Sequence, residues 1–372
     1  MSQSLPNRKA GATLSVEQQR FREFIGKVGS GEHTSTGLSR DEAREAMDLM
    51  LGGAASAAQI GAFLIAHRIR RPAPEELTGM LDSYRSHGPR LVTPGRRAIC
   101  FGVPYDGRTR TAPLLPLVAL VLAASGLPVV LHGGNPMPVK YGITLAELFA
   151  ALGLDWTDQS LEHSQRRLDQ HNLGVTHQPS HFAAAEALVS VRDAIGKRPP
   201  VASLELLWTP HHGDHLLVSG FVHPPTETRA WQALSLAGEH DVLTVKGLEG
   251  STDIPISRAC VTGRPSAAGD GRRILHPRDH GCYGPDPAWH GIETWTQQAL
   301  AALGSQGELA TALTWNAGTY LWQAGACSSL DEGLGRCRQL LESGAALHQL
   351  NSMRQDAIGS SGHRSNHQPQ NP

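Results

Sequence analysis

The sequence contains no apolar run long enough to cross a bilayer, and its opening residues, MSQSLPNRKAGATLS, include no apolar core of the kind found in secretory signals. Its five cysteines are scattered along the chain, and none of them forms a Cys-x-x-Cys pair. Neither a zinc ribbon nor a thioredoxin-type motif is therefore indicated. An odd number of separate cysteines is typical of reduced thiols. We expect a soluble, cytoplasmic protein with no membrane partner.

The chain also lacks a large net charge of either sign, since 33 lysines and arginines against 34 aspartates and glutamates give a net charge of −1. A surface of this kind does not attract nucleic acid or anionic membranes as a whole, so any basic patch must be local. One concentration of arginines precedes the first expected strand, and it comprises Arg68, Arg70, Arg71, Arg85, Arg90, Arg96 and Arg97.

The first part of the chain has the pattern of short amphipathic helices. Ser39 is followed three residues later by Glu42, and Ser56 by Gln59, and both pairs form capping boxes. Beyond Pro94, short apolar runs alternate with helical patterns, which is typical of a parallel sheet. We predict an α/β protein in which a small N-terminal α-helical domain precedes a larger α/β domain with a mainly parallel central sheet.

Residues 250–288 are rich in glycine and proline, and we expect them to form an irregular loop. The domain boundaries follow from the changes in sequence pattern. The predicted parts are a flexible tail at 1–15, a helical domain at 16–92 with additional helices from the following segment, an α/β domain at 93–350, and a flexible tail at 351–372.

Two loops that follow expected strands, GVPYDGRTRT and HGGN, have the composition of an anion site. Ligands bind at the carboxyl ends of parallel strands, and a buried helix that begins near Pro113 points its positive end there. Arg108 and Arg110 add fork-shaped donors for a phosphate or carboxylate, although solvated arginines in a turn would look the same. The residues predicted to bind phosphate or substrate are Gly102, Asp106, Gly107, Arg108, Thr109, Arg110, His132, Gly133, Asn135 and Lys140.

Two further segments carry residues that suit a metal ion. In VKGLEGSTDIP, Glu249 and Asp253 offer oxygen ligands for Mg²⁺, or are simply two solvated acids on a surface loop. The segment TPHHGDH, residues 209–215, is rich in histidine, with His211, His212 and His215 beside Asp214, but it is expected to lie between two strands and not on a helix. We interpret this second segment as a turn.

The order of these pieces resembles the anthranilate phosphoribosyltransferase family, also called glycosyltransferase family 3, over about residues 38–350. GLPVVLHGGN is similar to the family's strand that ends in Lys-His-Gly-Asn-Arg, and VSVRDAIG to its Val-Arg-x-x-Leu-Gly helix. The resemblance implies a homodimer paired through the helical domains, which transfers ribose 5-phosphate from phosphoribosyl pyrophosphate to an aromatic amine with the help of Mg²⁺. By position it also implies that Arg192 contacts the acceptor.

The chain departs from the family at the residues that carry this chemistry. The family's pyrophosphate loop, Gly-Thr-Gly-Gly-Asp, is replaced by Gly-Val-Pro-Tyr-Asp at 102–106. Pro104 has no N–H to donate, and Tyr105 does not readily adopt a conformation reserved for glycine. The paired Asp-Glu that recruits Mg²⁺ becomes Glu249 and Gly250. In outline these changes resemble a divergent branch of the family, some of whose members are dimers that bind nucleic acid without sequence preference.

These observations lead to two hypotheses about function. In the first, the protein is a glycosyl- or phosphoribosyltransferase that binds a phosphorylated ribose-type ligand, such as phosphoribosyl pyrophosphate, and has a substrate other than anthranilate. In the second, it is a non-catalytic protein on the same fold that binds nucleic acid or a phosphorylated metabolite. The rewritten pyrophosphate loop is the feature that separates them.

Overall fold

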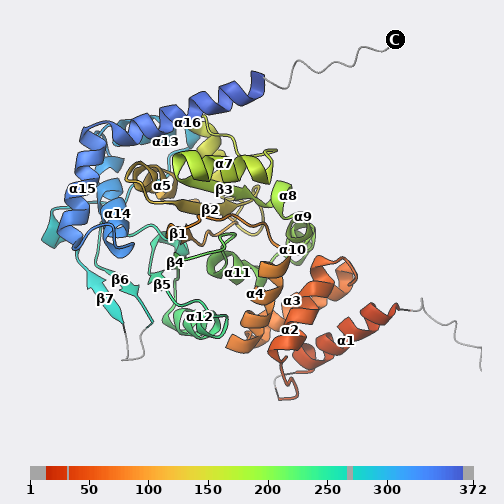
Figure 1. Cartoon of the computed structure of the whole chain (residues 1–372). Coiled ribbons are helices and arrows are strands. Elements are labelled where there is room, and N and C mark those ends of the chain that lie inside the picture. Colours follow the sequence, from red (N-terminus) through yellow and green to blue (C-terminus); the bar gives the residue numbers. More distant parts are fainter. Residues whose placement is uncertain (1–13, 32, 266–270, 363–372) are drawn as a thin grey trace, which may run out of the picture.

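The computed structural model of the chain describes residues 14–31, 33–265 and 271–362, and it gives no side-chain surroundings for 357–362. The outer parts of both expected tails, 1–13 and 363–372, lie outside the described residues. Figure 1 shows the N-terminal helices at one end of the molecule and the C-terminal helices at the other, with the sheet between them. Among the described residues, no helix is both long enough and apolar enough to span a bilayer.

The N-terminal helices begin where their sequence predicts. Ser15, Ser39 and Ser56 each cap the helix that follows, and each accepts a hydrogen bond from the backbone N–H three residues later. A Cβ at Gly79 would overlap the carbonyl oxygen of Arg40, so the second and fourth helices cross at a distance that only glycine permits. The four helices are α1 (Val16–Gly29), α2 (Arg40–Leu51), α3 (Ala57–Arg70) and α4 (Pro74–His87).

Later parts of the chain complete this helical region. Phe182, Leu188 and Val191 share one buried apolar cluster with Phe63 and Leu81 of the N-terminal helices. The segments that supply these residues and their neighbours are α8 (Gln178–His181), α9 (Ala183–Glu186), α10 (Val189–Ile195) and α11 (Val201–Leu207).

The central sheet has seven strands in the order β3-β2-β1-β4-β5-β6-β7, of which the first five in that order are parallel. This confirms the predicted α/β class with a mainly parallel sheet. The strands are β1 (Ala98–Phe101), β2 (Val129–Gly133), β3 (Leu173–His177), β4 (His215–Gly220), β5 (Val242–Val245), β6 (Cys260–Gly263) and β7 (Arg272–Leu275).

The remaining helices pack around this sheet. The segment Leu115–Ala124 is apolar nearly all round, and it forms a buried helix that packs against the C-terminal helices. These helices are α5 (Leu115–Ala124), α6 (Leu145–Ala151), α7 (Leu161–His171), α12 (Pro224–Leu236), α13 (Ile292–Leu303), α14 (Leu309–Gln323), α15 (Leu330–Glu342) and α16 (Ala345–Gly362).

Two sequence-based expectations differ from the structure. The prediction of an irregular loop over 250–288 is wrong in part, because β6 and β7 pair antiparallel there and extend the sheet. Their runs of four residues are too short to stand out between glycines and prolines. The helix α16 also continues beyond residue 350, where the expected tail begins, because Leu350 and Met353 are buried on its inner face.

The strand order reverses at β1, since β2 and β3 lie on one side of it and β4 and β5 on the other. In open α/β sheets the ligand crevice lies outside the carboxyl ends of the strands at such a switch point. The segments that follow β1 and β4 therefore face the same crevice.

Candidate functional site

The guanidinium group of Arg108, in the loop that follows β1, is buried and already paired within the protein. Its Nη1 donates to Asp253 Oδ2 at 2.6 Å and to Ser251 Oγ at 2.8 Å, and its Nη2 donates to Thr111. Its Nε lies 3.4 Å from Glu249 Oε1, and the Arg108 side chain is only 5% exposed. The fork-shaped donor expected for an external phosphate is therefore used by residues of the chain itself.

The backbone of the same loop binds the Glu249 carboxylate. The N–H groups of Thr109, Arg110 and Thr111 point to its two oxygens at 3.3, 3.2 and 3.0 Å, and Thr111 Oγ1 adds a bond of 2.9 Å. Successive backbone N–H groups that converge in this way form an anion-binding nest. Burial disfavours the charged form of Glu249, but the bonds from Thr111 and Thr109 and the charge of Arg108 outweigh it and lower its pKa to about 2.

The buried carboxylate of Asp253 occupies the second position predicted to attract an anion. Its Oδ2 accepts from the backbone N–H of Leu114 at 2.8 Å, at the residue that precedes the first turn of α5. The positive end of α5 is thus neutralised by a carboxylate from the chain. We call the set formed by Arg108, the 109–111 backbone, Glu249 and Asp253 the filled nest.

These two carboxylates do not fit a magnesium site as they are arranged. Mg²⁺ prefers octahedral oxygen ligands and usually retains several waters. Here Glu249 accepts hydrogen bonds on both oxygens, and Asp253 Oδ2 is shared between Arg108 and Leu114. A cation at this point would also lie beside the buried Arg108 guanidinium, which repels it.

The side chains of Tyr105, in the loop after β1, and His132, on β2, are buried and in contact with each other. The Tyr105 hydroxyl and His132 Nδ1 are 2.6 Å apart, and the His132 ring packs edge-on against Trp208. Burial lowers the pKa of His132 to about 3, so its ring is neutral at physiological pH. The side chain expected to contact phosphate is therefore a core group, although the backbone of Gly133 ends the same strand.

Arg192 is not open to an acceptor. Its guanidinium pairs with Glu205, and both side chains are buried between α10 and α11. Burial opposes the charge of Arg192, but the adjacent Glu205 carboxylate outweighs it and raises the Arg192 pKa.

The other predicted residues lie around the same crevice. Asp106 pairs with Arg198, Asn135 Oδ1 lies 3.0 Å from His177 Nε2, and Lys140 Nζ donates to the carbonyl of Gly107 at 3.3 Å. Arg110 is different, because its side chain is 78% exposed and its Nε lies 3.7 Å from Glu249 Oε2. Gly102 permits α11 to approach, since a Cβ there would overlap the backbone of Leu206.

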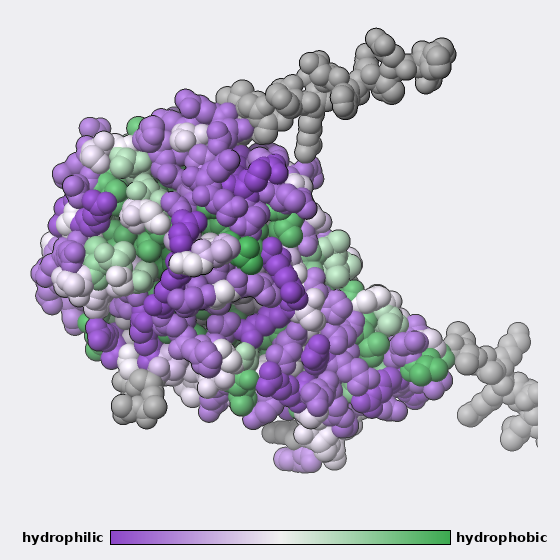
Figure 2. Space-filling model, viewed as in Figure 1, coloured by the Kyte–Doolittle hydropathy of each residue, from purple (hydrophilic) through white to green (hydrophobic). Residues whose placement is uncertain are grey.

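A cleft of 840 Å³ opens at the carboxyl end of β4, next to this crevice. Helices α3, α4, α11 and α12 border it, so it lies between the helical region and the sheet. Figure 2 shows a hollow near the middle of this face that is bordered mainly by hydrophilic residues. Its basic side chains are Arg68, Arg71, Arg198, Arg229 and His223.

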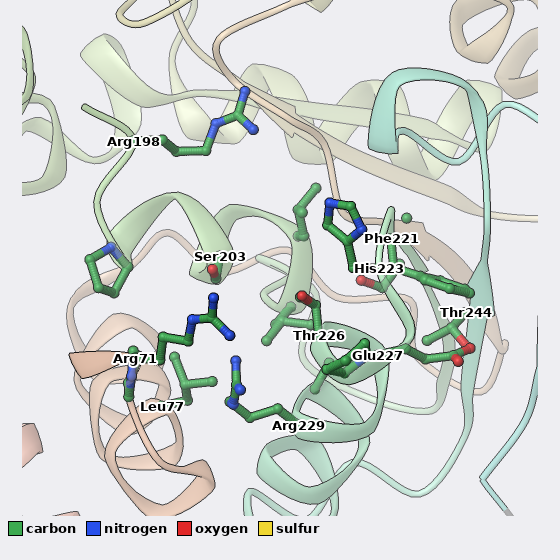
Figure 3. A pocket seen from close by; sticks show the side chains of 18 of the residues that line it. Arg71, Leu77, Arg198, Ser203, Phe221, His223, Thr226, Glu227, Arg229 and Thr244 are labelled. Atoms are coloured by element: carbon green, nitrogen blue, oxygen red, sulfur yellow. The ribbon is translucent and has the colours of Figure 1, made fainter. Parts of the chain in front are cut away.

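The arginines of this cleft differ in how far they are already paired. Arg68 donates to the Arg198 carbonyl at 2.8 Å, and Arg198 pairs with Asp106. Within the described residues, neither Arg71 nor Arg229 has an ion pair or a side-chain hydrogen bond. Figure 3 shows Arg198 at the upper end of the cleft and Arg71 and Arg229 at the lower end. The arginine concentration in the sequence includes Arg71, but no sequence signal singled out Arg198 or Arg229.

The arrangement of the helical region and the sheet matches that of solved phosphoribosyltransferase structures. Anthranilate phosphoribosyltransferase from Thermus thermophilus matches with a TM-score of 0.73 and 25% identity, over 90% of this chain and 98% of that one. The fold is also shared with the Saccharomyces cerevisiae enzyme in complex with PRPP and Mg, with a TM-score of 0.77 and 14% identity over 92% and 99% of the two chains.

Sequence comparison identifies the family within this class. The helical bundle domain of a glycosyl transferase family matches residues 22–88, and its a/b domain matches residues 114–347. Anthranilate phosphoribosyltransferase of Methylobacterium sp. (strain 4-46) is 29% identical over 332 residues, which cover 88% of this chain and 95% of that protein. The chain belongs to this glycosyl transferase family, which confirms the resemblance drawn from its motifs.

Proposed function

We propose that the protein binds a phosphorylated ribose-type ligand in the cleft at the end of β4, with Arg71 and Arg229 as the principal phosphate contacts. The observation that carries this proposal is that these two arginines line the cleft without a carboxylate partner among the described residues, whereas the charge of Arg108 is already neutralised. An arginine guanidinium binds phosphate through paired N–H donors, so two such groups with free charge at one end of a cleft favour an anionic ligand.

The size and surroundings of the cleft agree with a ligand of this class. A volume of 840 Å³ lies within the range of about 300 to 1,000 Å³ that small-molecule sites occupy. Ser203 and Thr226 add hydroxyl groups that suit the oxygens of a sugar, and Phe221 and Leu207 add apolar surface. The cleft also opens at the carboxyl end of β4, next to the switch point of the sheet, and ligands of open α/β folds bind at that end of the strands.

We further propose that ligand binding does not require Mg²⁺ and that the protein does not transfer ribose 5-phosphate from phosphoribosyl pyrophosphate to anthranilate. The filled nest supports both statements, because Glu249 and Asp253 are bound to Arg108 and to backbone N–H groups. The S. cerevisiae enzyme, which was solved with PRPP and Mg, supports the ligand class, and the use of Mg²⁺ is the point at which we expect this chain to differ from it.

The test is a calorimetric titration of the full chain with ribose 5-phosphate and with phosphoribosyl pyrophosphate, each with and without Mg²⁺. We expect binding of similar affinity in both conditions, and loss of that binding in the double variant Arg71→Ala/Arg229→Ala. Arg110→Ala is the matched control, because this exposed arginine lies on the loop of the filled nest. Binding that appears only with Mg²⁺, together with anthranilate-dependent release of pyrophosphate, would contradict the proposal.

Two further expectations stay predictions and can be measured on the same material. If single-stranded DNA binds instead of the sugar phosphates, and does so more weakly as salt increases, the nucleic-acid hypothesis is favoured. The homodimer paired through the helical domain is tested by light scattering after gel filtration, with a monomer mass as the contrary result.

A further inference from the structure

A separate group of metal-ligating side chains lies on β1 and around the amino end of β4, whereas the cleft opens at the carboxyl end of β4. Cys100, His211 and His215 each place one ligand atom within 4.8 Å of the other two. Cys100 and His211 are buried and His215 is half-buried. The sequence shows 209–215 as a histidine-rich turn, and only the fold brings Cys100 of β1 against it.

The register of the sheet produces this convergence. His215 begins β4 opposite Ala98 of β1, and Cys100 lies two residues further along β1, where its side chain points to the same face as that of Ala98. The preceding turn then folds His211 back over the strand ends. Gly213 makes this possible, because its φ is 146° and a Cβ there would lie only 3.2 Å from the His211 ring.

The two imidazoles are held in a defined geometry by neighbours outside the group. Their rings are nearly perpendicular, at 86°, and their Nδ1 atoms lie 3.4 Å apart. The hydroxyl of Thr93 lies 2.9 Å from His211 Nε2, and Glu239 Oε2 lies 3.2 Å from His215 Nε2. His215 Nδ1 lies 2.8 Å from the Gly213 carbonyl oxygen, a contact that a bound metal ion would replace. A hydroxyl or carboxylate on the second ring nitrogen is the arrangement that orients histidine ligands in metal sites.

We propose that Cys100, His211 and His215 form a binding site for a divalent transition metal ion, with Zn²⁺ as the best match, that ties β1 to the turn before β4. One thiolate and two imidazoles are ligands that Zn²⁺ prefers, whereas Mg²⁺ and Ca²⁺ prefer oxygen. At metal–ligand distances of about 2.0 to 2.3 Å, two ligands of a tetrahedral ion lie about 3.3 to 3.8 Å apart. The 3.4 Å between the two Nδ1 atoms meets this requirement, and all three ligand atoms lie within 4.8 Å of one another.

A metal ion binds these ligands in their deprotonated forms, so its uptake releases the proton of the Cys100 thiol to solvent. With three protein ligands, the fourth tetrahedral position is left to water.

The test uses the full chain, freed of metal with a chelator under reducing conditions and then titrated with Co²⁺ alone and afterwards with Zn²⁺. We expect the visible bands of tetrahedral Co²⁺ and a sulfur-to-cobalt charge-transfer band in the ultraviolet, both lost on addition of Zn²⁺. Cys100→Ala should lose the charge-transfer band and weaken binding at least tenfold. Cys260→Ala, which removes another buried thiol, should leave both unchanged.

A second variant separates the loss of a metal ligand from misfolding, which replacement of the buried Cys100 could also cause. His215→Gln lies at the half-buried position, and it should also weaken Co²⁺ binding at least tenfold and abolish any Zn²⁺-dependent rise in Tm. His212→Gln, the neighbouring histidine outside the group, should behave as wild type. Wild-type protein that shows no Co²⁺ spectrum, or a spectrum retained in both Cys100→Ala and His215→Gln, would overturn the proposal.

Discussion

The loop after β1 and the cleft after β4 lie at the same edge of the sheet, yet their arginines differ. The charge of the arginine in the loop is neutralised by carboxylates, whereas two arginines of the cleft have no such partner in the part of the chain that the structure describes. Arg108 is buried against Asp253 and Ser251, and the adjacent backbone binds Glu249. In the cleft, Arg71 and Arg229 line an open volume with no carboxylate partner among the described residues. An arginine in a loop at the carboxyl end of a strand therefore indicates a phosphate site only when no carboxylate of the protein already neutralises its charge.

The largest effect on the free energy of unfolding is expected from the removal of Arg108, which pairs with both carboxylates of the filled nest. Arg108→Ala leaves the buried carboxylates of Asp253 and Glu249 without their cation, and we expect a loss of about 3 to 5 kcal/mol in the free energy of unfolding. Urea denaturation measures this loss. Arg110→Ala is the control, and its cost should stay within about 0.5 kcal/mol because that side chain is exposed. Equal losses in the two variants would show that the pairs of Arg108 contribute little.

The opposite behaviour is expected in the cleft, where binding changes and stability does not. Each guanidinium bonded to a phosphate contributes about 1.5 to 3 kcal/mol, so Arg71→Ala/Arg229→Ala should weaken ribose 5-phosphate binding by about a hundredfold or more. Calorimetry gives the affinity, and urea denaturation should show the same unfolding free energy as wild type. An unchanged affinity would remove these two arginines from the site.

Removing the Glu249 carboxylate should free the N–H groups of the loop after β1, so that this loop can bind an external anion, as we propose for the cleft. Glu249→Ala leaves the N–H groups of 109–111 without their acceptor, which we expect to cost about 1 to 3 kcal/mol of stability. The variant should then gain stability from added inorganic phosphate, as an external anion takes the vacated place. A phosphate-dependent rise in Tm that is larger than that of wild type is the measurement. No such gain would show that the loop does not bind anions even when empty.

The smallest effect concerns pH. The pKa of Glu249 is about 2 in the folded protein, below its ordinary value of 4.5. Its contribution is therefore complete above pH 4.5 and is lost as the pH falls toward 2, because the carboxyl group takes up its proton in the unfolded chain before it does so in the folded protein. Glu249→Gln should lose less stability than wild type over this range, as seen in denaturation curves at successive pH values. Parallel curves for the two proteins would contradict the lowered pKa.

The sequence predicts best what depends on neighbouring residues. The caps at Ser39 and Ser56 act over three residues, and both are found where the pattern places them. The alternation of strands and helices likewise predicted the sheet. Glu249 and Thr111 are separated by 138 residues, so no local pattern could show that the carboxylate fills the loop. For the same reason no local pattern placed Cys100 beside His211 and His215.

The most direct test of the contrast between the filled nest and the cleft is a crystal structure of the full chain with ribose 5-phosphate bound. We predict phosphate density between Arg71 and Arg229 in the cleft, with Glu249 still bound to the backbone N–H groups of 109–111. Phosphate density in that loop, with Glu249 displaced and Arg108 turned toward the ligand, would contradict this prediction.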